Sequence, residues 1–265
     1  MYSKDDDKLI DESEYKIRCS EDNRYFIETQ SYLRLRDTFK KMRNSRGQII
    51  HVVGAPGTGK STNIYAAMEK LDMNFYEVKL KLPNSQLNSK EVFHQMIKSM
   101  GDDLEINPIE NLLKYLKKFD AVVFADQFHD FQLVDNESVS FSQWTDFNGL
   151  KTFSFYLICI WEYLKHWKEF QDINLILQTA WRIRFRGKKK DLFTDMGLFS
   201  KLALILLKIL FNVVKISYSE KETINIVKSY LKDVDEDVIR QYIKKYHCKP
   251  RFICQAIIKQ DHKNQ

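Results

Sequence analysis

The sequence predicts an α/β fold in which a parallel sheet carries helices on both faces and a small helical unit follows at the C-terminus. Three observations predict it. Strand-like apolar runs alternate with helical patterns from residue 49 to residue 218, an order typical of parallel strands joined by crossover helices. A glycine-rich stretch, Gly54–Ser61, stands between the first strand and the helix after it. After Ser219 only helical patterns remain.

The elements follow one another in a regular order. Residues 1–24 are rich in Asp and are expected to be a flexible acidic lead-in. Strands are predicted over 49–53, 74–81, 121–126, 173–179 and 213–218. Helices are predicted over 27–43, 61–71, 89–101, 108–118 and 151–170, and then over 220–233, 235–246 and 250–260. We therefore expect an α/β domain over 25–218 and a helical domain over 219–265.

The stretch from Leu198 to Ile216 is strongly apolar but contains lysines at positions 201, 208 and 215. A spacing of seven residues puts Lys201 and Lys208 on one face of a helix. We expect a helix with a solvated lysine stripe and with its Leu, Ile and Phe side chains buried opposite, which argues against a membrane span. Lys215 is expected to lie in the following strand.

Length and composition describe a globular chain. Its 265 residues are 44% hydrophobic and 29% charged, enough for one large domain or for a large and a small one. The net charge of +6 permits an acidic partner without requiring one. No C-x-x-C pair and no secretory signal are present, so we expect reduced thiols in a cytoplasmic protein, or in a nuclear one if the cell is eukaryotic. His247, Cys248, Cys254 and His262 fit no common zinc spacing.

The glycine-rich stretch is the most specific pattern in the chain. It runs Gly54, Ala55, Pro56, Gly57, Thr58, Gly59, Lys60, Ser61 and matches the phosphate-loop pattern G-x-x-x-x-G-K-[ST]. Glycines let successive backbone N–H groups curl around an anion, and the following helix adds the positive end of its dipole. We predict that residues 54–62, including Thr62, bind ATP or ADP. Lys60 would reach the β- and γ-phosphates, and Ser61 would ligate Mg²⁺.

A second nucleotide-related pattern is the apolar strand that ends in Asp126. A carboxylate in this place helps to hold the Mg²⁺ shell, so Ser61 and Asp126 are the predicted metal ligands. The next residue, Gln127, can orient a water molecule but cannot accept its proton. We therefore expect slow hydrolysis, with His129 or Asp130 as the alternative base.

These motifs resemble those of the AAA+ ATPase superfamily over about residues 25–260, closest in style to its origin-recognition and STAND-like branches and to small archaeal ATPases. The likeness implies a parallel P-loop NTPase sheet with a C-terminal helical lid. It implies that Thr179, which ends strand 173–179, is the sensor-1 residue facing the γ-phosphate or the attacking water. Lys249-Pro250-Arg251-Phe252 resembles the sensor-2 motif, whose arginine reaches the phosphates from the lid. The residues implied in catalysis are Lys60, Asp126, Gln127, Thr179 and Arg251.

Four features depart from the family pattern. Gln127 stands where an acid is usual, and no arginine lies just ahead of strand 213–218, where many relatives place an arginine finger. The segment between Asp126 and strand 173–179 is longer than a strand–helix–strand unit needs. The sequence ends at the lid, so a winged-helix DNA reader is not expected. The first two departures argue for slow turnover, and the last argues against DNA binding.

The densest positive charge lies between Trp181 and Lys190. An extended chain would put the arginines on one face and Trp181, Ile183 and Phe185 on the other. Three interpretations stay open: contact with nucleic-acid phosphates, action of one arginine on a neighbouring subunit's nucleotide, or a solvated rim. The residues concerned are Arg182, Arg184, Arg186, Lys188, Lys189 and Lys190. The aromatic-rich helix 151–170 is expected to be mostly core, with a protein-docking surface as the alternative.

The favoured function is an Mg-ATP-binding switch whose lid reports the nucleotide state, with slow or partner-stimulated hydrolysis and with a protein partner or self-assembly. The first alternative is a nucleic-acid loading or remodelling factor that uses the basic segment. The second is a nucleotide-dependent scaffold without turnover. A small kinase also begins with a phosphate loop, but Lys249-Pro250-Arg251 and the long path from Lys60 to Asp126 argue against it.

Overall fold

A computed structural model describes residues 26–78, 98–106, 109–118, 122–125, 161, 164–165, 167–179, 182–185 and 188–264. Its strands are β1 (Ile49–Val53), β2 (Phe75–Glu77), β3 (Val122–Ala125), β4 (Leu175–Thr179), β5 (Arg182–Phe185), β6 (Lys188–Asp191) and β7 (Asn212–Lys215). Its helices are α2 (Gln30–Arg43), α3 (Lys60–Lys70), α5 (Ile109–Lys118), η4 (Trp167–Phe170), α7 (Leu198–Leu210), α8 (Glu220–Tyr230), α9 (Glu236–Tyr246) and α10 (Pro250–Asn264). Residues 98–104 are also helical.

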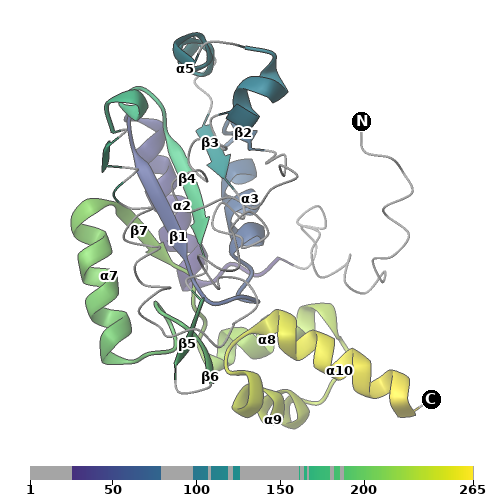
Figure 1. Cartoon of the computed structure of the whole chain (residues 1–265). Coiled ribbons are helices and arrows are strands. Elements are labelled where there is room, and N and C mark those ends of the chain that lie inside the picture. The colour runs from purple at the N-terminus through teal and green to yellow at the C-terminus, as the bar shows by residue number, and fades with distance from the viewer. Residues whose placement is uncertain are drawn as a thin grey trace.

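The main sheet has five strands in the order β2-β3-β4-β1-β7, and every neighbouring pair is parallel (Figure 1). The predicted parallel α/β sheet is therefore confirmed. Val53 at the end of β1 is in register with Thr179 of β4 on one side and with Lys215 of β7 on the other. The carboxyl ends of these three strands meet at one edge of the sheet, where open α/β sheets bind ligands.

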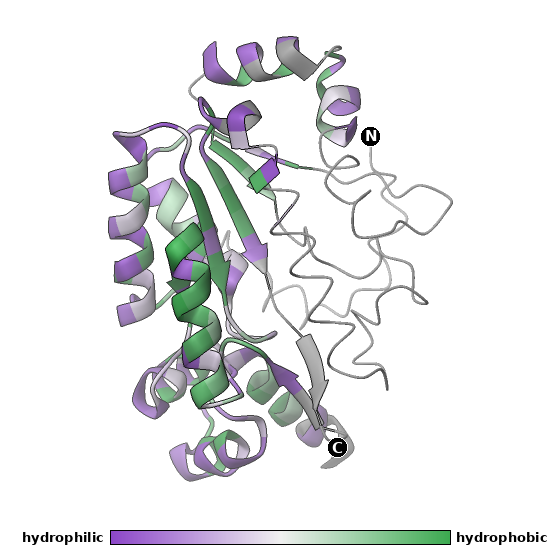
Figure 2. Ribbon diagram, turned by 60° about the vertical axis from the view of Figure 1, so that its left-hand side comes forward, coloured by the Kyte–Doolittle hydropathy of each residue, from purple (hydrophilic) through white to green (hydrophobic). Residues whose placement is uncertain are grey.

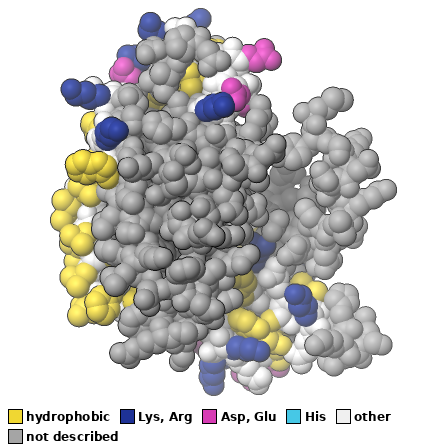
Figure 3. Space-filling model, in the orientation of Figure 1, with side chains coloured by type: hydrophobic (Ala, Val, Ile, Leu, Met, Phe, Trp, Pro, Cys, Tyr) yellow, Lys and Arg dark blue, Asp and Glu magenta, His cyan; other side chains and the backbone are white. Residues whose placement is uncertain are grey.

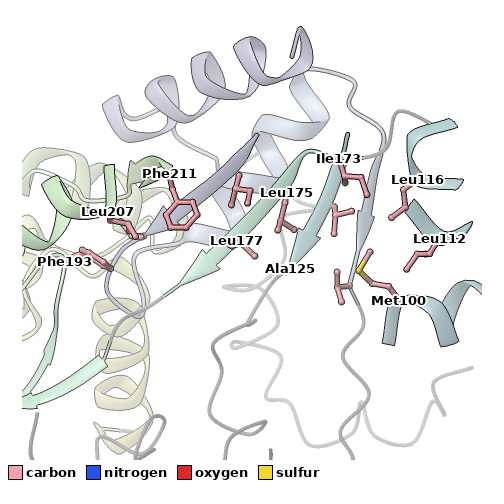
Figure 4. Close-up of a cluster of buried hydrophobic side chains, with 14 of the residues drawn as sticks. Met100, Leu112, Leu116, Ala125, Ile173, Leu175, Leu177, Phe193, Leu207 and Phe211 are labelled. Atoms are coloured by element: carbon pink, nitrogen blue, oxygen red, sulfur yellow. The ribbon is translucent and has the colours of Figure 1, made fainter. Parts of the chain in front are cut away.

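Helices cover both faces of this sheet, as the sequence predicts. On one face, α2 and α3 pack Phe39, Leu35 and Ile64 against β1, β3 and β4. On the other face, helix 98–104, α5 and α7 contribute Met100, Leu112, Leu116 and Leu207 to a second cluster (Figure 4). Burial of these apolar side chains holds the layers together.

The three C-terminal helices pack around a core of their own, which includes Val227, Ile239 and Ile253. Local signals set their limits. Ser219 and Glu222 form a capping box at the start of α8, and Pro250 begins α10, where its missing N–H costs nothing. The N–H of Gln30 donates to Glu222 Oε1 (2.9 Å), which ties the start of α2 to the start of α8.

The basic segment is extended, as the sequence analysis considered, but it forms a hairpin that the sequence did not predict. β5 and β6 pair antiparallel as a separate two-stranded sheet, with Arg182 opposite Asp191 and Phe185 opposite Lys188. The chain then turns through residues 192–197 into α7. This turn brings Leu192 and Phe193 into the same cluster as Leu207.

Helix α7 corrects one prediction. Lys201 and Lys208 are exposed as expected, but most of the apolar side chains of this helix are exposed too, and only Ser200 and Leu207 are buried. All residues of α7 except Ser200, Lys201 and Lys208 are apolar, so the helix has more than one apolar side. It packs through the side that contains Ser200 and Leu207, and a second apolar side faces outward. Figure 2 shows α7 as a hydrophobic rod on the outside of the domain.

Other boundaries differ by a few residues. β2 has three residues where eight were predicted, and the last three predicted positions, 79–81, lie outside the described residues. β7 ends at Lys215, three residues before the predicted end. Most of the predicted helix 151–170 lies outside the described residues, and its last four residues are a 3-10 turn. Among the helices that the structure describes, none has the length and apolar character to cross a bilayer.

Candidate functional site

The turn between β1 and α3 is shaped by two of its glycines. Gly57 (φ +82°) and Gly59 (φ +67°) both lie in the left-handed region, which glycine adopts without strain. Gly59 is the N-cap of α3 and offers no side chain there, so the N–H groups of the first helical turn stay accessible to a ligand. The turn follows the pattern predicted from the sequence.

Lys60 lies at the start of α3 and is buried. Its Nζ donates hydrogen bonds to the carbonyl oxygens of Gly54 (3.0 Å) and Ala55 (3.2 Å), so the side chain folds back over the turn. Thr58 Oγ1 donates to the same Ala55 carbonyl (2.8 Å). The ammonium group is thus held inside the loop by two neutral acceptors, a weaker environment for a charge than a phosphate provides.

One of the predicted site residues, Ser61, contacts the carboxyl end of β4. Ser61 Oγ donates to Gln178 Oε1 (2.9 Å), and Gln178 directly precedes Thr179. The backbone of Thr179 pairs with Val53, immediately before the loop. No sequence pattern points to Gln178, because a glutamine inside a buried strand belongs to no motif. Asp126, Gln127, His129 and Asp130 lie outside the described residues.

A partly buried tyrosine, Tyr218, supports the start of α3 from the side of the sheet where β7 lies. Asn63 Nδ2 donates to the Gly59 carbonyl (2.7 Å) and to the Tyr218 hydroxyl (2.8 Å). Burial raises the pKa of Tyr218, although its hydrogen bond with Asn63 acts the other way. The neutral phenol therefore holds Asn63 against the loop. The sequence contained no signal for this pair, since its members are 155 residues apart.

The last residue of β6, Asp191, places a carboxyl group close enough to Lys60 for the two charges to interact. Asp191 is fully buried, and its Oδ2 accepts hydrogen bonds from Phe193 N (3.1 Å) and Thr194 Oγ1 (2.9 Å). Its Oδ1 has no hydrogen-bond partner among the described residues. Burial raises the pKa of Asp191 to about 6, although the positive charge of Lys60 lowers it in part. No sequence motif points to Asp191.

The same turn is joined to the C-terminal helices by an ion pair. Asp195 Oδ2 accepts from the backbone N–H of Asp191 (3.1 Å) and from Lys249 Nζ (3.0 Å). Burial opposes ionisation of Asp195, but the N–H of Asp191 and the charge of Lys249 outweigh it and lower its pKa. Lys249 immediately precedes α10. The ion pair therefore links the turn beside Lys60 to the start of that helix.

The start of α10 also touches the phosphate loop directly. The N–H of Arg251 donates to the Gly57 carbonyl (3.3 Å), and a Cβ added at Gly57 would lie 3.3 Å from the Phe252 ring. The segment predicted from its likeness to sensor 2 thus lies against the loop through backbone and ring contacts. These contacts are a route by which a change in the loop can reach α8–α10.

We expect Lys249→Gln to loosen the C-terminal helices. A partly buried ion pair of this kind contributes about 1–2 kcal/mol, so amides of α8–α10 should exchange with solvent several-fold faster than in the parent chain. Hydrogen exchange read by mass spectrometry measures this. Lys244→Gln, at an exposed position in the last turn of α9, is the control and should leave exchange unchanged. Equal exchange in the two variants would show that Lys249 does not hold the helices.

Comparisons with known proteins give similarities to solved structures alone, and these are low. No protein-family model matches the chain, and a search of curated proteins gives no match. Among solved structures, the RuvB Holliday junction branch migration motor of Thermotoga maritima is similar at 14% identity and a TM-score of 0.42, over 90% of this chain and 63% of that one. AMPPCP-bound DnaA of Aquifex aeolicus is similar at 16% identity and a TM-score of 0.40, over 89% and 62%.

This chain spans less than two thirds of either neighbour. At such identities and TM-scores, any function proposed for this chain depends on its own residues. Those residues form a parallel α/β fold with a phosphate-loop turn at the carboxyl edge of its sheet and with a three-helix unit in contact with that turn.

Proposed function

We propose that this chain is an AAA+-type switch that binds Mg-ATP in the turn after β1 and reports the nucleotide through α8–α10. Residues 25–218 would be the nucleotide-binding domain and residues 219–265 the lid. The observation that carries the proposal is the contact between the two: the Gly57 carbonyl, inside the loop, accepts the N–H of Arg251, the second residue of α10. A phosphate bound in the loop changes the surroundings of both partners.

Each residue of the site has a defined part in this proposal. The N–H groups of residues 54–62 would bind the phosphates, and Lys60 would leave the Gly54 and Ala55 carbonyls for the β- and γ-phosphates, a stronger charge-assisted contact. Ser61 and Asp126 would hold Mg²⁺, which neutralises phosphate charge. Thr179 and Arg251 would contact the γ-phosphate, so ATP would favour the closed lid more than ADP does.

Hydrolysis should be slow in this proposal. Gln127 can orient a water molecule but cannot take its proton, and the charge that stabilises the transition state would come from Lys60 and Arg251. The nucleotide would then act as a timer that is reset when a protein partner, or a second copy of the chain, completes the site. A basic hairpin made by β5 and β6 favours nucleic acid as a second candidate partner.

Calorimetry with adenine nucleotides, combined with phosphate release, tests the proposal. We expect saturable heat with Mg-ATP, affinity at least about tenfold weaker when EDTA removes the metal, and turnover below about 1 s⁻¹. Faster release with single-stranded DNA or RNA at low salt would favour the nucleic-acid candidate, whereas binding without any release would favour the scaffold. The absence of heat with ATP and ADP would refute nucleotide binding.

A further inference from the structure

Helix α7 presents a continuous apolar face to solvent. Its exposed side chains are Leu198, Phe199, Leu202, Ile205, Leu206, Ile209 and Leu210, with exposed fractions of 41–73%. At about 100° per residue, these positions fall within roughly 140° of the helix circumference, directly opposite the buried pair Ser200 and Leu207. Figure 3 shows them as a hydrophobic band along one edge of the molecule. Single exposed apolar residues are ordinary, but a contiguous face of this size marks an interaction surface.

The charged residues of α7 itself are both lysines. Between Leu198 and Tyr218 the chain contains three lysines and no Asp or Glu. Lys201 and Lys208 are exposed on α7, and the helical angle places both on one border of the apolar face. Long lysine side chains at such a border can lie along apolar surface and reach an anionic group with the ammonium. The face therefore suits a partner surface with an apolar interior and anionic groups at its boundary with water.

A second copy of the chain fits this face less well. In an antiparallel pair of α7 helices related by a two-fold axis, residues on the same border meet, which places Lys201 of one copy beside Lys208 of the other. No acidic residue of α7 is present to separate these charges. The composition also differs from a typical protein hot spot, since the face is made of Leu and Ile with one Phe and has no Trp, Tyr or Arg.

We propose that α7 is a membrane-surface helix that binds anionic lipid. Its 13 residues span about 20 Å, too short for the roughly 30 Å hydrocarbon core of a bilayer, so the helix would lie in the interface plane. The outward Leu, Ile and Phe side chains would enter the boundary between headgroups and acyl chains, and Lys201 and Lys208 would contact lipid phosphates or carboxylates. This proposal does not depend on nucleotide binding.

Vesicle flotation of the full 265-residue chain tests it. The probes are vesicles of phosphatidylcholine alone and vesicles with 40% phosphatidylserine. We expect flotation with the anionic vesicles that is at least about tenfold stronger than with the neutral ones and that declines as salt is raised. Leu202→Gln with Ile205→Gln and Ile209→Gln should abolish flotation. These positions are exposed and glutamine is a good helix former, so the fold should be retained, as circular dichroism would verify.

Two further variants separate the explanations. Lys201→Gln with Lys208→Gln keeps the apolar face and should reduce anionic binding by about tenfold or more, close to fivefold for each lysine. Tyr115→Gln with Val238→Gln removes exposed apolar side chains from α5 and α9 and should bind like the parent chain. No flotation at low salt would overturn the proposal. Concentration-dependent dimers in sedimentation that the triple glutamine variant abolishes, without flotation, would assign the face to a second copy instead.

Discussion

Lys60→Ala should weaken ATP binding by about 100-fold or more. The loss of a buried charged partner costs about 2–5 kcal/mol, and each 1.4 kcal/mol is a factor of ten in affinity. In this chain Lys60 is the first residue of α3, and its Nζ already lies within the loop, bonded to the Gly54 and Ala55 carbonyls. Titration calorimetry with Mg-ATP measures the change, and phosphate release should fall with it.

Lys70→Ala is the matched control for this experiment. Lys70 is the last residue of the same helix and is exposed, so its removal changes the net charge equally without touching the loop. Lys60→Ala should also lose about 1–3 kcal/mol of stability, because the Gly54 carbonyl loses its lysine donor and the Ala55 carbonyl keeps only Thr58. Urea unfolding must show that the variant is folded before its affinity is compared. A folded Lys60→Ala variant with the ATP affinity of the parent would contradict the assignment of the phosphate loop.

Asp191→Asn should change how stability depends on pH. The pKa of Asp191 is raised from an ordinary value near 3.8 to about 6 in the folded chain. The folded state therefore holds this proton more tightly than the unfolded state does, and the free energy of unfolding falls as the pH rises from about 4 to about 6. At about 1.4 kcal/mol for each pKa unit, the loss approaches 3 kcal/mol above pH 6. An asparagine stays neutral and avoids this loss.

Urea unfolding of the parent chain and of Asp191→Asn at pH 4, 5, 6 and 7.5 measures the effect. The variant's stability relative to the parent should increase by roughly 3 kcal/mol between pH 4 and pH 7.5, because other titrating groups cancel in the difference. Asp195→Asn is the control with the opposite sign. The pKa of Asp195 is lowered, so its carboxylate stabilises the fold at neutral pH and that contribution is lost as the pH falls. If the difference in unfolding free energy between Asp191→Asn and the parent did not change with pH, burial would not raise the pKa of the Asp191 carboxyl group.

The destabilising carboxylate of Asp191 interacts with Lys60, and this interaction is relevant to the proposed switch. Lys60 lowers the pKa of Asp191 in part, so the two charges stabilise each other. When Lys60 turns to a triphosphate, Asp191 would lose part of that compensation. The backbone N–H of Asp191 bonds Asp195, which holds Lys249 at the start of α10. Nucleotide binding would therefore affect the C-terminal helices through Asp191, Asp195 and Lys249 as well as through the Gly57–Arg251 contact.

The sequence alone predicted those parts of the molecule that depend on local pattern. Strand 49–53 matches β1, because four β-branched residues in a run of five, followed by a glycine turn, allow few alternatives. Gly57 and Gly59 have the positive φ angles that the phosphate-loop pattern implies. Pro250 begins α10 as predicted. The alternation of strands and helices was enough to predict a parallel sheet, since parallel strands need crossover helices.

Only the tertiary structure decided which distant residues meet. Ser61 bonds Gln178 across 117 positions of the chain, and Lys249 pairs with Asp195 across 54. Such pairs depend on strand order and register, which no local pattern carries. The same holds for α7: its periodicity predicts a helix with lysines on one side, but a helix that is apolar almost all round has two sides able to pack. Which of them met the sheet was set by the turn after β6 and by Phe193 and Phe211 beside Leu207, and the other side was left outward.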